Sequence, residues 1–293
     1  RLRQQSEKNK SKVFSGVAAS VDCNSRWVSL DPFRGTIAAV AESARNVSCV
    51  GAEPVAITNN LNFSSPDTEI GYWQLASSCD GISEACKVLE TPVTGGNVSL
   101  YNESKNKANE ITPINPTPVI GMVGKIDNVE KAISSEWKNI DDQIWIIGSY
   151  KSEKTIAASS YLEYFHGEIT GRPPKIDLVD EKICQSFLRE AIYQSFVVSS
   201  HDISDGGLAI ALAESCILSA KGATIELQKD IYRDDNLLFA EGGSRIIFSI
   251  DKMKEKEWLN YLSKNKINSH SSVYLKKIGY VSSQALKIKI KDI

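Results

Sequence analysis

Apolar and polar residues recur along this chain with two different periods, and these periods predict both strands and helices. Residues 17–31 alternate between apolar and polar side chains, which is typical of a half-buried strand. From Thr36 to Val50 the apolar residues recur every three to four positions, which predicts a helix that ends at Gly51. Residues 70–89 show the same spacing and predict a longer helix.

Short apolar runs and further periodic segments continue to the end of the chain. Strands are expected over residues 54–58, 98–101, 118–123, 143–148, 197–202, 222–227, 244–250 and 272–280, and helices over residues 178–196, 207–217 and 253–264. Ser204 and Asp205 are expected to cap the helix that begins at Gly207. Residues 286–292 alternate lysine with apolar side chains, as charged edge strands do.

The polar segment 125–142 divides these elements into two groups. A chain of 293 residues has about the length of two domains. Both groups mix strands and helices without a regular strand–helix–strand alternation. We therefore predict a two-domain α+β protein, with a first domain over residues 1–126 and a second over residues 127–293.

Composition and charge argue against several classes of protein. Hydrophobic residues make up 42% and charged residues 24%, which is ordinary for a globular chain. No apolar run reaches the roughly 18 residues of a membrane span, and a net charge of −2 gives no basic excess for nucleic acid. The six cysteines form no CxxC pair, so we expect reduced, buried thiols in a cytoplasmic protein. Because the chain starts at Arg1 in a basic stretch, we expect a truncated piece of a longer protein.

The glycine-rich segment 94–99, Thr-Gly-Gly-Asn-Val-Ser, is the first candidate site. Paired glycines let backbone N–H groups approach an anion closely. The carbonyl oxygen of Asn97 suits Mg²⁺, and Ser99 lies on the same side of an extended backbone, where its hydroxyl can donate to a phosphate. A β-hairpin turn is the alternative, because Gly-Gly-Asn is common turn chemistry.

Three further polar clusters are candidates for binding. The asparagines in segment 58–63 follow a buried strand and suit the base or ribose of a nucleotide, with Asx turns as the alternative. Segment 201–207, which begins His-Asp, suits a metal or a phosphate, with a capped helix start as the alternative. Arg45 lies in an apolar helix, so it needs either an anion or a carboxylate partner.

Three segments follow one another in an order that resembles a known family: DCNSRWVSLDPFRGTIAAVAESARNVSCVGAEPVAITNNLNF, TPVTGGNVSLYNES and HDISDGGLAIALAES. Together they resemble phosphoribosylformylglycinamidine synthase, and the resemblance runs from about Gly16 to the C-terminus. It implies an aminoimidazole-ribonucleotide-synthetase-like unit, an A domain followed by a B domain, as the second of two tandem copies. The family's catalytic Glu-Ser-His-Asn-His-Pro motif belongs to the first copy, so no catalytic residue is expected in this chain.

The resemblance implies a binding site that is shared between the two copies. Asn59 and Gly96 of this chain would contact ATP, Asn97 would bind Mg²⁺, and Ser99 would contact the substrate. Many relatives have Asp where this chain has Asn59, and an amide hydrogen-bonds a nucleotide without adding charge.

The resemblance also implies that the pseudo-symmetric site of this copy is not catalytic. Asn24 stands where the first copy has its catalytic His, and Asn46 stands where it has a magnesium carboxylate. The first copy's Glu-Ser-Gln motif becomes Glu241-Gly242-Gly243. A nucleotide held structurally by Asp22 and Asp202 is a hypothesis for this second site.

The implied reaction is the ATP-dependent amidation of formylglycinamide ribonucleotide to formylglycinamidine ribonucleotide through an iminophosphate, with ammonia derived from glutamine. The implied partners are the N-terminal half of the same subunit, a glutaminase subunit and a small bridging subunit, with no nucleic acid and no membrane. Two alternatives stay open. One is a non-catalytic nucleotide-binding or assembly half of that enzyme, and the other is a different synthetase of the superfamily, making aminoimidazole ribonucleotide or a thiamine or selenium phosphate.

Overall fold

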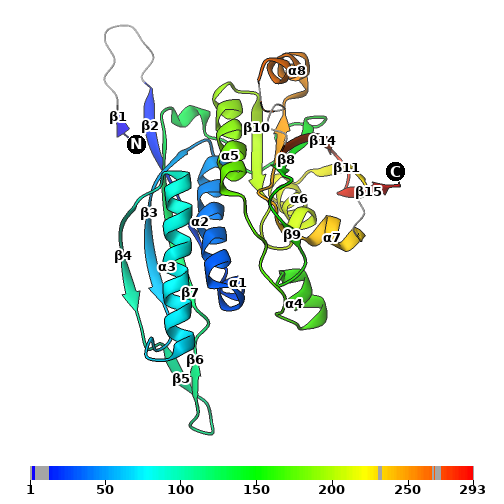
Figure 1. Ribbon diagram of the computed structural model, residues 1–293. Coiled ribbons are helices and arrows are strands. Elements are labelled where there is room, and N and C mark those ends of the chain that lie inside the picture. The colour runs from blue at the N-terminus through cyan, green and yellow to red at the C-terminus, as the bar shows by residue number, and fades with distance from the viewer. Residues whose placement is uncertain (1, 4–12, 230–232, 266, 268–271, 293) are drawn as a thin grey trace.

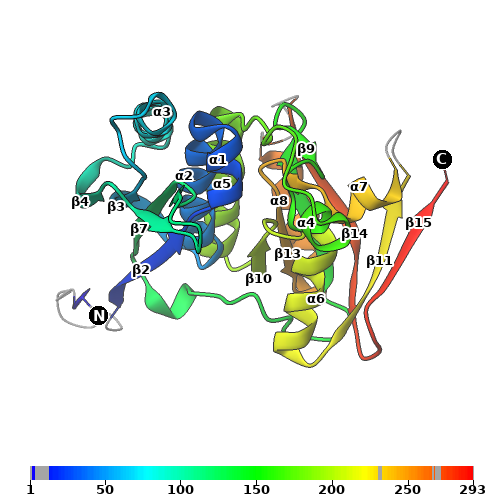
Figure 2. The same ribbon diagram turned by 90° about the horizontal axis from the view of Figure 1, so that it is seen from below.

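The computed structural model describes residues 2–3, 13–229, 233–265, 267 and 272–292. The basic stretch at the start of the chain, residues 1–12, lies almost entirely outside the described residues. Two sheets lie on either side of a layer of helices, as the two views in Figure 1 and Figure 2 show.

The first sheet contains five strands in the order β1-β2-β7-β3-β4. They are Leu2–Arg3 (β1), Phe14–Asp22 (β2), Thr117–Ile126 (β7), Glu53–Asn62 (β3) and Val93–Ser99 (β4). β3 and β4 run parallel, and the other pairs are antiparallel. A separate hairpin, β5 (Glu103–Lys105) and β6 (Ile111–Pro113), extends beyond the end of this sheet in Figure 1.

Helices cover one face of the first sheet. They are α1 (Ser25–Leu30), α2 (Pro32–Cys49) and α3 (Glu69–Leu89). Val40 of α2 is fully buried in the same cluster as Ile57 and Met122 from the strands, so this face forms the first core. The opposite face carries Val21, which is 72% exposed, and no described helix covers it.

The second sheet contains six strands in the order β10-β13-β8-β14-β11-β15. They are Val197–Asp202 (β10), Ile246–Ile250 (β13), Gln143–Ser149 (β8), Val273–Ser282 (β14), Gly222–Gln228 (β11) and Lys287–Lys291 (β15). The helices of this half are α4 (Ser160–His166), α5 (Leu178–Tyr193), α6 (Gly207–Ser219), α7 (Asp234–Phe239) and α8 (Glu255–Lys264). Short elements complete it: η1 (Val129–Lys131), η2 (Lys252–Lys254), and the paired strands β9 (Lys154–Thr155) and β12 (Glu241–Gly242).

Both faces of the second sheet are buried, because side chains alternate between two cores. Trp145 and Ile147 of β8 pack with α5 and α8, whereas Ile144 and Ile146 pack with α6. This explains why β8 reads as a continuous apolar run. α5 also packs against α2, so the two halves of the chain meet helix to helix between the sheets.

The predicted α+β class is confirmed, and most predicted elements are present. The predicted strand over residues 17–31 is wrong in its second half, because Asn24 accepts a hydrogen bond from the backbone N–H of Trp27 and starts α1. The turn alternative for the Gly-Gly segment is also wrong, because Gly95 and Gly96 lie inside β4. The domain boundary after residue 126 stays a prediction; β7 ends at Ile126 and the next sheet strand begins at Gln143.

Candidate functional site

Parallel pairing of β3 with β4 brings the two predicted binding segments side by side at the edge of the first sheet. Asn59 lies opposite Gly96, and Asn97 lies opposite Asn60. Segments almost forty positions apart in the chain thus become neighbours. The sheet brings together the four residues that the family resemblance assigned to one site.

The four residues do not face the same side of the sheet. Paired residues on neighbouring strands point the same way, and successive residues point opposite ways. Asn59 and Gly96 are in register with each other on the side that faces α3, between the buried Ile57 and Leu61. Asn97 and Ser99 lie on the opposite side of β4. The structure therefore divides the candidates into a helix-side pair and an outer-side pair.

Gly96 is required by the close approach of the Asn59 side chain. A Cβ atom at this position would overlap both the side-chain oxygen and the carbonyl oxygen of Asn59. The neighbouring Gly95 has no atom within 4 Å of such a Cβ. The two glycines are thus not equivalent, and only Gly96 makes room for the amide.

The side chain of Asn59 has no hydrogen bond to any described residue, whereas that of Ser99 is engaged. The Ser99 hydroxyl lies 3.2 Å from Asn102 Oδ1 and donates to it. Asn102 Nδ2 in turn donates to the carbonyl oxygens of Ser99 at 2.9 Å and Phe63 at 3.1 Å. Asn102 therefore fixes the end of β4 against the end of β3, a contact that the sequence analysis missed.

Asn97 is the only one of these four residues proposed as a metal ligand. Its side chain is exposed and has one amide oxygen, a ligand type that Mg²⁺ binds in proteins. Within the described ranges no group of three or more His, Cys, Asp or Glu side chains is arranged to hold a metal ion. The side chain of Asn97 is therefore suited to serve as a single amide ligand.

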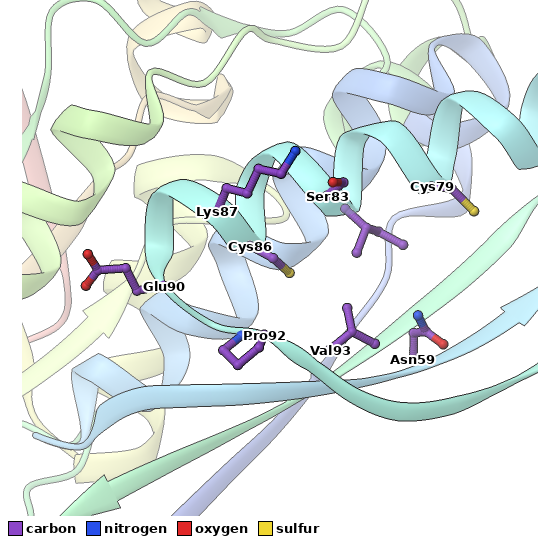
Figure 3. A pocket seen from close by; sticks show the side chains of 9 residues that line it. Asn59, Cys79, Ser83, Cys86, Lys87, Glu90, Pro92 and Val93 are labelled. Atoms are coloured by element: carbon purple, nitrogen blue, oxygen red, sulfur yellow. The ribbon is translucent and has the colours of Figure 1, made fainter.

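A groove opens on the helix side of β4, next to Asn59. It has a volume of about 560 Å³ and runs between α3 and the start of β4. Figure 3 shows the sulfur atoms of Cys79 and Cys86 and the amide of Asn59 pointing into the space between helix and strands. Most of its exposed lining is apolar, and Pro92 and Val93 form the strand side.

The two residues proposed for the second, pseudo-symmetric site lie where the two halves of the chain meet. Asp22 Oδ1 accepts a hydrogen bond from Asn46 Nδ2 at 2.9 Å. Asp202 Oδ2 lies 4.0 Å from Nε of Arg45. Arg45 also forms a buried ion pair with both carboxylate oxygens of Glu181 at 2.9 Å. The sequence analysis considered either a bound anion or a carboxylate as the partner of Arg45, and the structure shows the carboxylate of Glu181.

Burial and neighbouring charges shift the pKa values in this cluster in opposite directions. Burial raises the pKa of Asp22, and the nearby Asp202 charge adds to the rise. Burial also opposes ionisation of Asp202, but a hydrogen bond from His201 and the charge of Arg45 outweigh it and lower its pKa. Burial raises the pKa of Glu42 to about 8, with repulsion from Asp202 as the next cause.

Little space remains in this cluster. The cavity between Asn24, Arg45 and Asp205 measures about 10 Å³, which is room for one water molecule at most. Asn24 is occupied in capping α1, so its role in the described chain is structural. The nucleotide hypothesis for Asp22 and Asp202 stays a prediction, and a nucleotide would need the surrounding side chains to move.

Glu241 has a function that the sequence analysis did not predict. Its Oε1 accepts from the backbone N–H groups of Ser160 at 2.8 Å and Gly206 at 2.9 Å. One carboxylate thus serves the starts of both α4 and α6. The prediction that Ser204 and Asp205 cap α6 is wrong, because the N-terminus of this helix has no side-chain cap of its own.

Comparison with known proteins places these features in a family. The model of the AIR synthase related protein N-terminal domain matches residues 11–126, and the model of the C-terminal domain matches residues 139–284. The chain belongs to the AIR synthase related family. Both domains of the family are present in their usual order.

The curated relatives are members of the family that the sequence motifs resemble. The chain is 88% identical over 292 residues to the phosphoribosylformylglycinamidine synthase subunit PurL of Prochlorococcus marinus strain MIT 9312, and 53% identical over 291 residues to that of strain MIT 9303. The match covers 100% and 97% of this chain but only 38% and 37% of those proteins. The resemblance to this family is confirmed, and the chain spans less than two fifths of the length of these relatives.

Solved structures show the same fold at low sequence identity. Thermotoga maritima PurL complexed with FGAR superposes with a TM-score of 0.74 at 18% identity, covering 94% of this chain and 44% of that chain. A thiamine monophosphate kinase from Aquifex aeolicus gives 0.58 at 16% identity and covers 95% and 88%. The same fold therefore occurs in a PurL subunit and in a thiamine monophosphate kinase. Within the described residues, no helix has the length and apolar character needed to cross a membrane.

Proposed function

We propose that this chain forms the second-copy part of an ATP-dependent ligase that converts formylglycinamide ribonucleotide and ammonia to formylglycinamidine ribonucleotide. The observation that carries the proposal is the β3–β4 register, which places Asn59, Gly96, Asn97 and Ser99 at one sheet edge. The identity of 88% to a PurL subunit over the whole chain supports the same conclusion.

In this proposal each pair of residues has a separate task. Asn59 offers a free amide to ATP, and Gly96 keeps that amide accessible. On the other side of β4, Asn97 supplies one oxygen to Mg²⁺, and Ser99 positions the substrate, with Asn102 holding its hydroxyl. Bound Mg²⁺ would offset the charge that develops on the transferring phosphoryl group.

The remaining groups of the site must come from the rest of the subunit. The outer face of the first sheet has no helix over it among the described residues and exposes apolar side chains, with Val17 65%, Val21 72% and Val123 38% exposed. Such a face is typical of a surface that another part of the same protein covers. We propose that the N-terminal half docks there and brings the catalytic residues to Asn97 and Ser99. A glutaminase subunit and a small bridging subunit would supply the ammonia.

Turnover measured in trans tests this proposal. This chain alone is expected to give no ATP- and ammonia-dependent turnover of formylglycinamide ribonucleotide, and addition of the N-terminal half is expected to restore it. Asn97→Ala and Ser99→Ala should each lower the restored rate at least about tenfold, the cost of one lost charge-assisted contact of about 1.4 kcal/mol. Restored turnover that neither variant affects would contradict the shared site, and turnover by the chain alone would contradict the division of tasks.

A matched pair of glycine variants tests the nucleotide side. Gly96→Ala is expected to weaken ATP binding by the reconstituted subunit, because its Cβ would displace the Asn59 amide. Gly95→Ala is the control, since nothing lies within 4 Å of its Cβ. Equal ATP affinities for the two variants would remove Gly96 and Asn59 from the nucleotide site.

A further inference from the structure

Four polar side chains share the outer side of β3 and β4, away from α3. In the parallel register Asn60 lies opposite Asn97, and Asn62 lies opposite Ser99. Paired residues on neighbouring strands point the same way, and every second residue of a strand shares one side. The proposed function gives tasks to Asn97 and Ser99 on this side and none to Asn62.

The amide of Asn62 has both of its hydrogens engaged within the protein. Its Nδ2 donates to the carbonyl oxygens of Asn60 and Thr117, both at 3.1 Å. The opposite orientation of the amide would point Oδ1 at these two carbonyl oxygens, so the hydrogen-bond network fixes the orientation. Oδ1 has no hydrogen bond to any described residue, and the side chain is half-buried. Asn62 therefore has an acceptor available for a ligand and no donor.

The hydroxyl of Ser99 is in the same condition. Asn102 Oδ1, at 3.2 Å, is its only described acceptor. Asn102 Nδ2 also lies 3.1 Å from Ser99 Oγ, but the carbonyl oxygens of Ser99 and Phe63, at 2.9 Å and 3.1 Å, compete for its two hydrogens. These carbonyl oxygens can only accept, whereas the hydroxyl can donate to the otherwise unpaired Oδ1. Since a hydroxyl oxygen has two lone pairs, Ser99 Oγ still has capacity to accept.

Two neighbouring acceptors with no free donor select the chemistry of their ligand. Oxygen acceptors repel a phosphate or a carboxylate and bind hydroxyl or N–H groups. Neighbouring strands lie about 4.8 Å apart, so side chains from a register pair can reach one small group. In a ribonucleotide the ribose carries two adjacent hydroxyl donors, whereas the amide N–H groups of formylglycinamide are separate single donors.

We infer that Asn62 and Ser99 together bind the vicinal hydroxyls of the substrate's ribose, with Asn62 Oδ1 and Ser99 Oγ each accepting from one hydroxyl. The inference rests on the proposed function, in which Ser99 contacts a ribonucleotide. It adds Asn62 to the residues that contact the substrate. It also reverses the expected direction of the Ser99 contact, because the hydroxyl accepts from the ribose and does not donate to a phosphate.

Substrate analogues test the contact in the complete, unmodified subunit. The 2′-deoxy and 3′-deoxy forms of formylglycinamide ribonucleotide each lack one donor. Each analogue should raise KM about tenfold, because one acceptor is left unpaired. The Kd of ATP should not change, since Asn59 and Gly96 lie on the other side of the sheet. An unchanged KM for either analogue would overturn the paired contact.

Two variants of the complete subunit assign the hydroxyls to their acceptors. Asn62→Ala and Ser99→Ala should each raise the KM of the natural substrate about tenfold. Each variant should lose its effect with the analogue that lacks its own hydroxyl, and the two variants should respond to different analogues. Asn260→Ala is the matched control, because this asparagine is exposed on α8, and its KM values should equal those of the unmodified subunit.

The outcomes separate this inference from the proposed function. If the unmodified subunit shows no ATP- and ammonia-dependent turnover of formylglycinamide ribonucleotide, the proposed function fails. If turnover is normal and each variant raises KM by the same factor for all three substrates, its role is structural and the inference alone is wrong. If Asn62→Ala does not fold, the same comparison with Ser99→Ala decides between these results.

Discussion

The buried charge of Arg45 is balanced by a carboxylate that lies far away in the chain. Its guanidinium is almost fully buried between α2 and α5 and pairs with Glu181 at 2.9 Å. The sequence predicts that such an arginine needs a partner, because a buried charge without one is strongly unfavourable. Only the packing of α2 against α5 decides that the partner is Glu181, which stands 136 positions along the chain.

Removal of this arginine should be among the most damaging single changes in the chain. Arg45→Met leaves Glu181 buried without its counter-charge, so the free energy of unfolding should fall by about 3–5 kcal/mol. Urea denaturation measures the loss. Lys252→Met is the matched control, because its ion pair with Asp141 is exposed and should contribute little. Similar losses for both variants would mean that Arg45 is not stabilised as described.

Glu42 should make folded stability depend on pH. Burial raises its pKa from 4.5 to about 8 in the folded chain, and repulsion from Asp202 adds to the rise while Arg45 opposes it. An acid with a raised pKa binds more protons in the folded state, so its contribution to stability is present below the unfolded pKa and is lost as the pH rises through the folded value. The difference in stability between Glu42→Gln and the unmodified chain should therefore favour the variant more at pH 8 than at pH 5. Urea unfolding at both values measures this difference, and parallel pH profiles would contradict it.

Helix starts show how an element can depend on a distant side chain. α2 and α3 carry their own caps, Asp31 and Thr68, and both helices were predicted from local pattern. α6 has no such cap, and its start depends on Glu241, which the sheet strand β12 delivers. Local pattern located this helix correctly but identified the wrong capping residues, since the actual acceptor is 35 positions away.

Two variants at Glu241 should separate hydrogen bonding from charge. Glu241→Ala leaves two buried N–H groups at Ser160 and Gly206 without an acceptor, so stability should fall by about 1–3 kcal/mol. Glu241→Gln retains an oxygen in the same place and should lose clearly less. Thermal or urea unfolding distinguishes them, and a glutamine variant as unstable as the alanine variant would show that charge is the dominant contribution.

At the scale of the whole molecule, the two sheets differ in how completely they are covered. The second sheet is buried on both faces by α5, α8 and α6, whereas the first has helices on one face only. The continuous apolar run over residues 144–148 agrees with a strand that is buried on both faces. In β2 the burial does not follow hydrophobicity, because Val17 and Val21 lie on the exposed face. The bare face is where the proposed function needs the N-terminal half to dock.

A charge placed on the bare face should affect assembly but not folding. Val21→Lys changes a side chain that is 72% exposed, so the stability of this chain should change by less than about 0.5 kcal/mol. Association with the N-terminal half, measured by sedimentation or by restored turnover, should be lost. Ile217→Lys on α6 is the matched control, because Ile217 is 76% exposed on the other half of the chain. Normal assembly of the Val21 variant would place the interface elsewhere.

The sequence by itself determined the α+β class, the long helices, the charged edge strand β15 and the segments that carry the binding residues. These depend on local period and on residue types at fixed spacing, which neighbours along the chain largely decide. It could not determine that Asn59 and Gly96 face α3 while Asn97 and Ser99 face away, because side-chain direction follows from strand register. The groove, the Glu181 partner of Arg45 and the shared cap at Glu241 were likewise decided only by the tertiary structure, since each joins residues from elements that are distant in the chain.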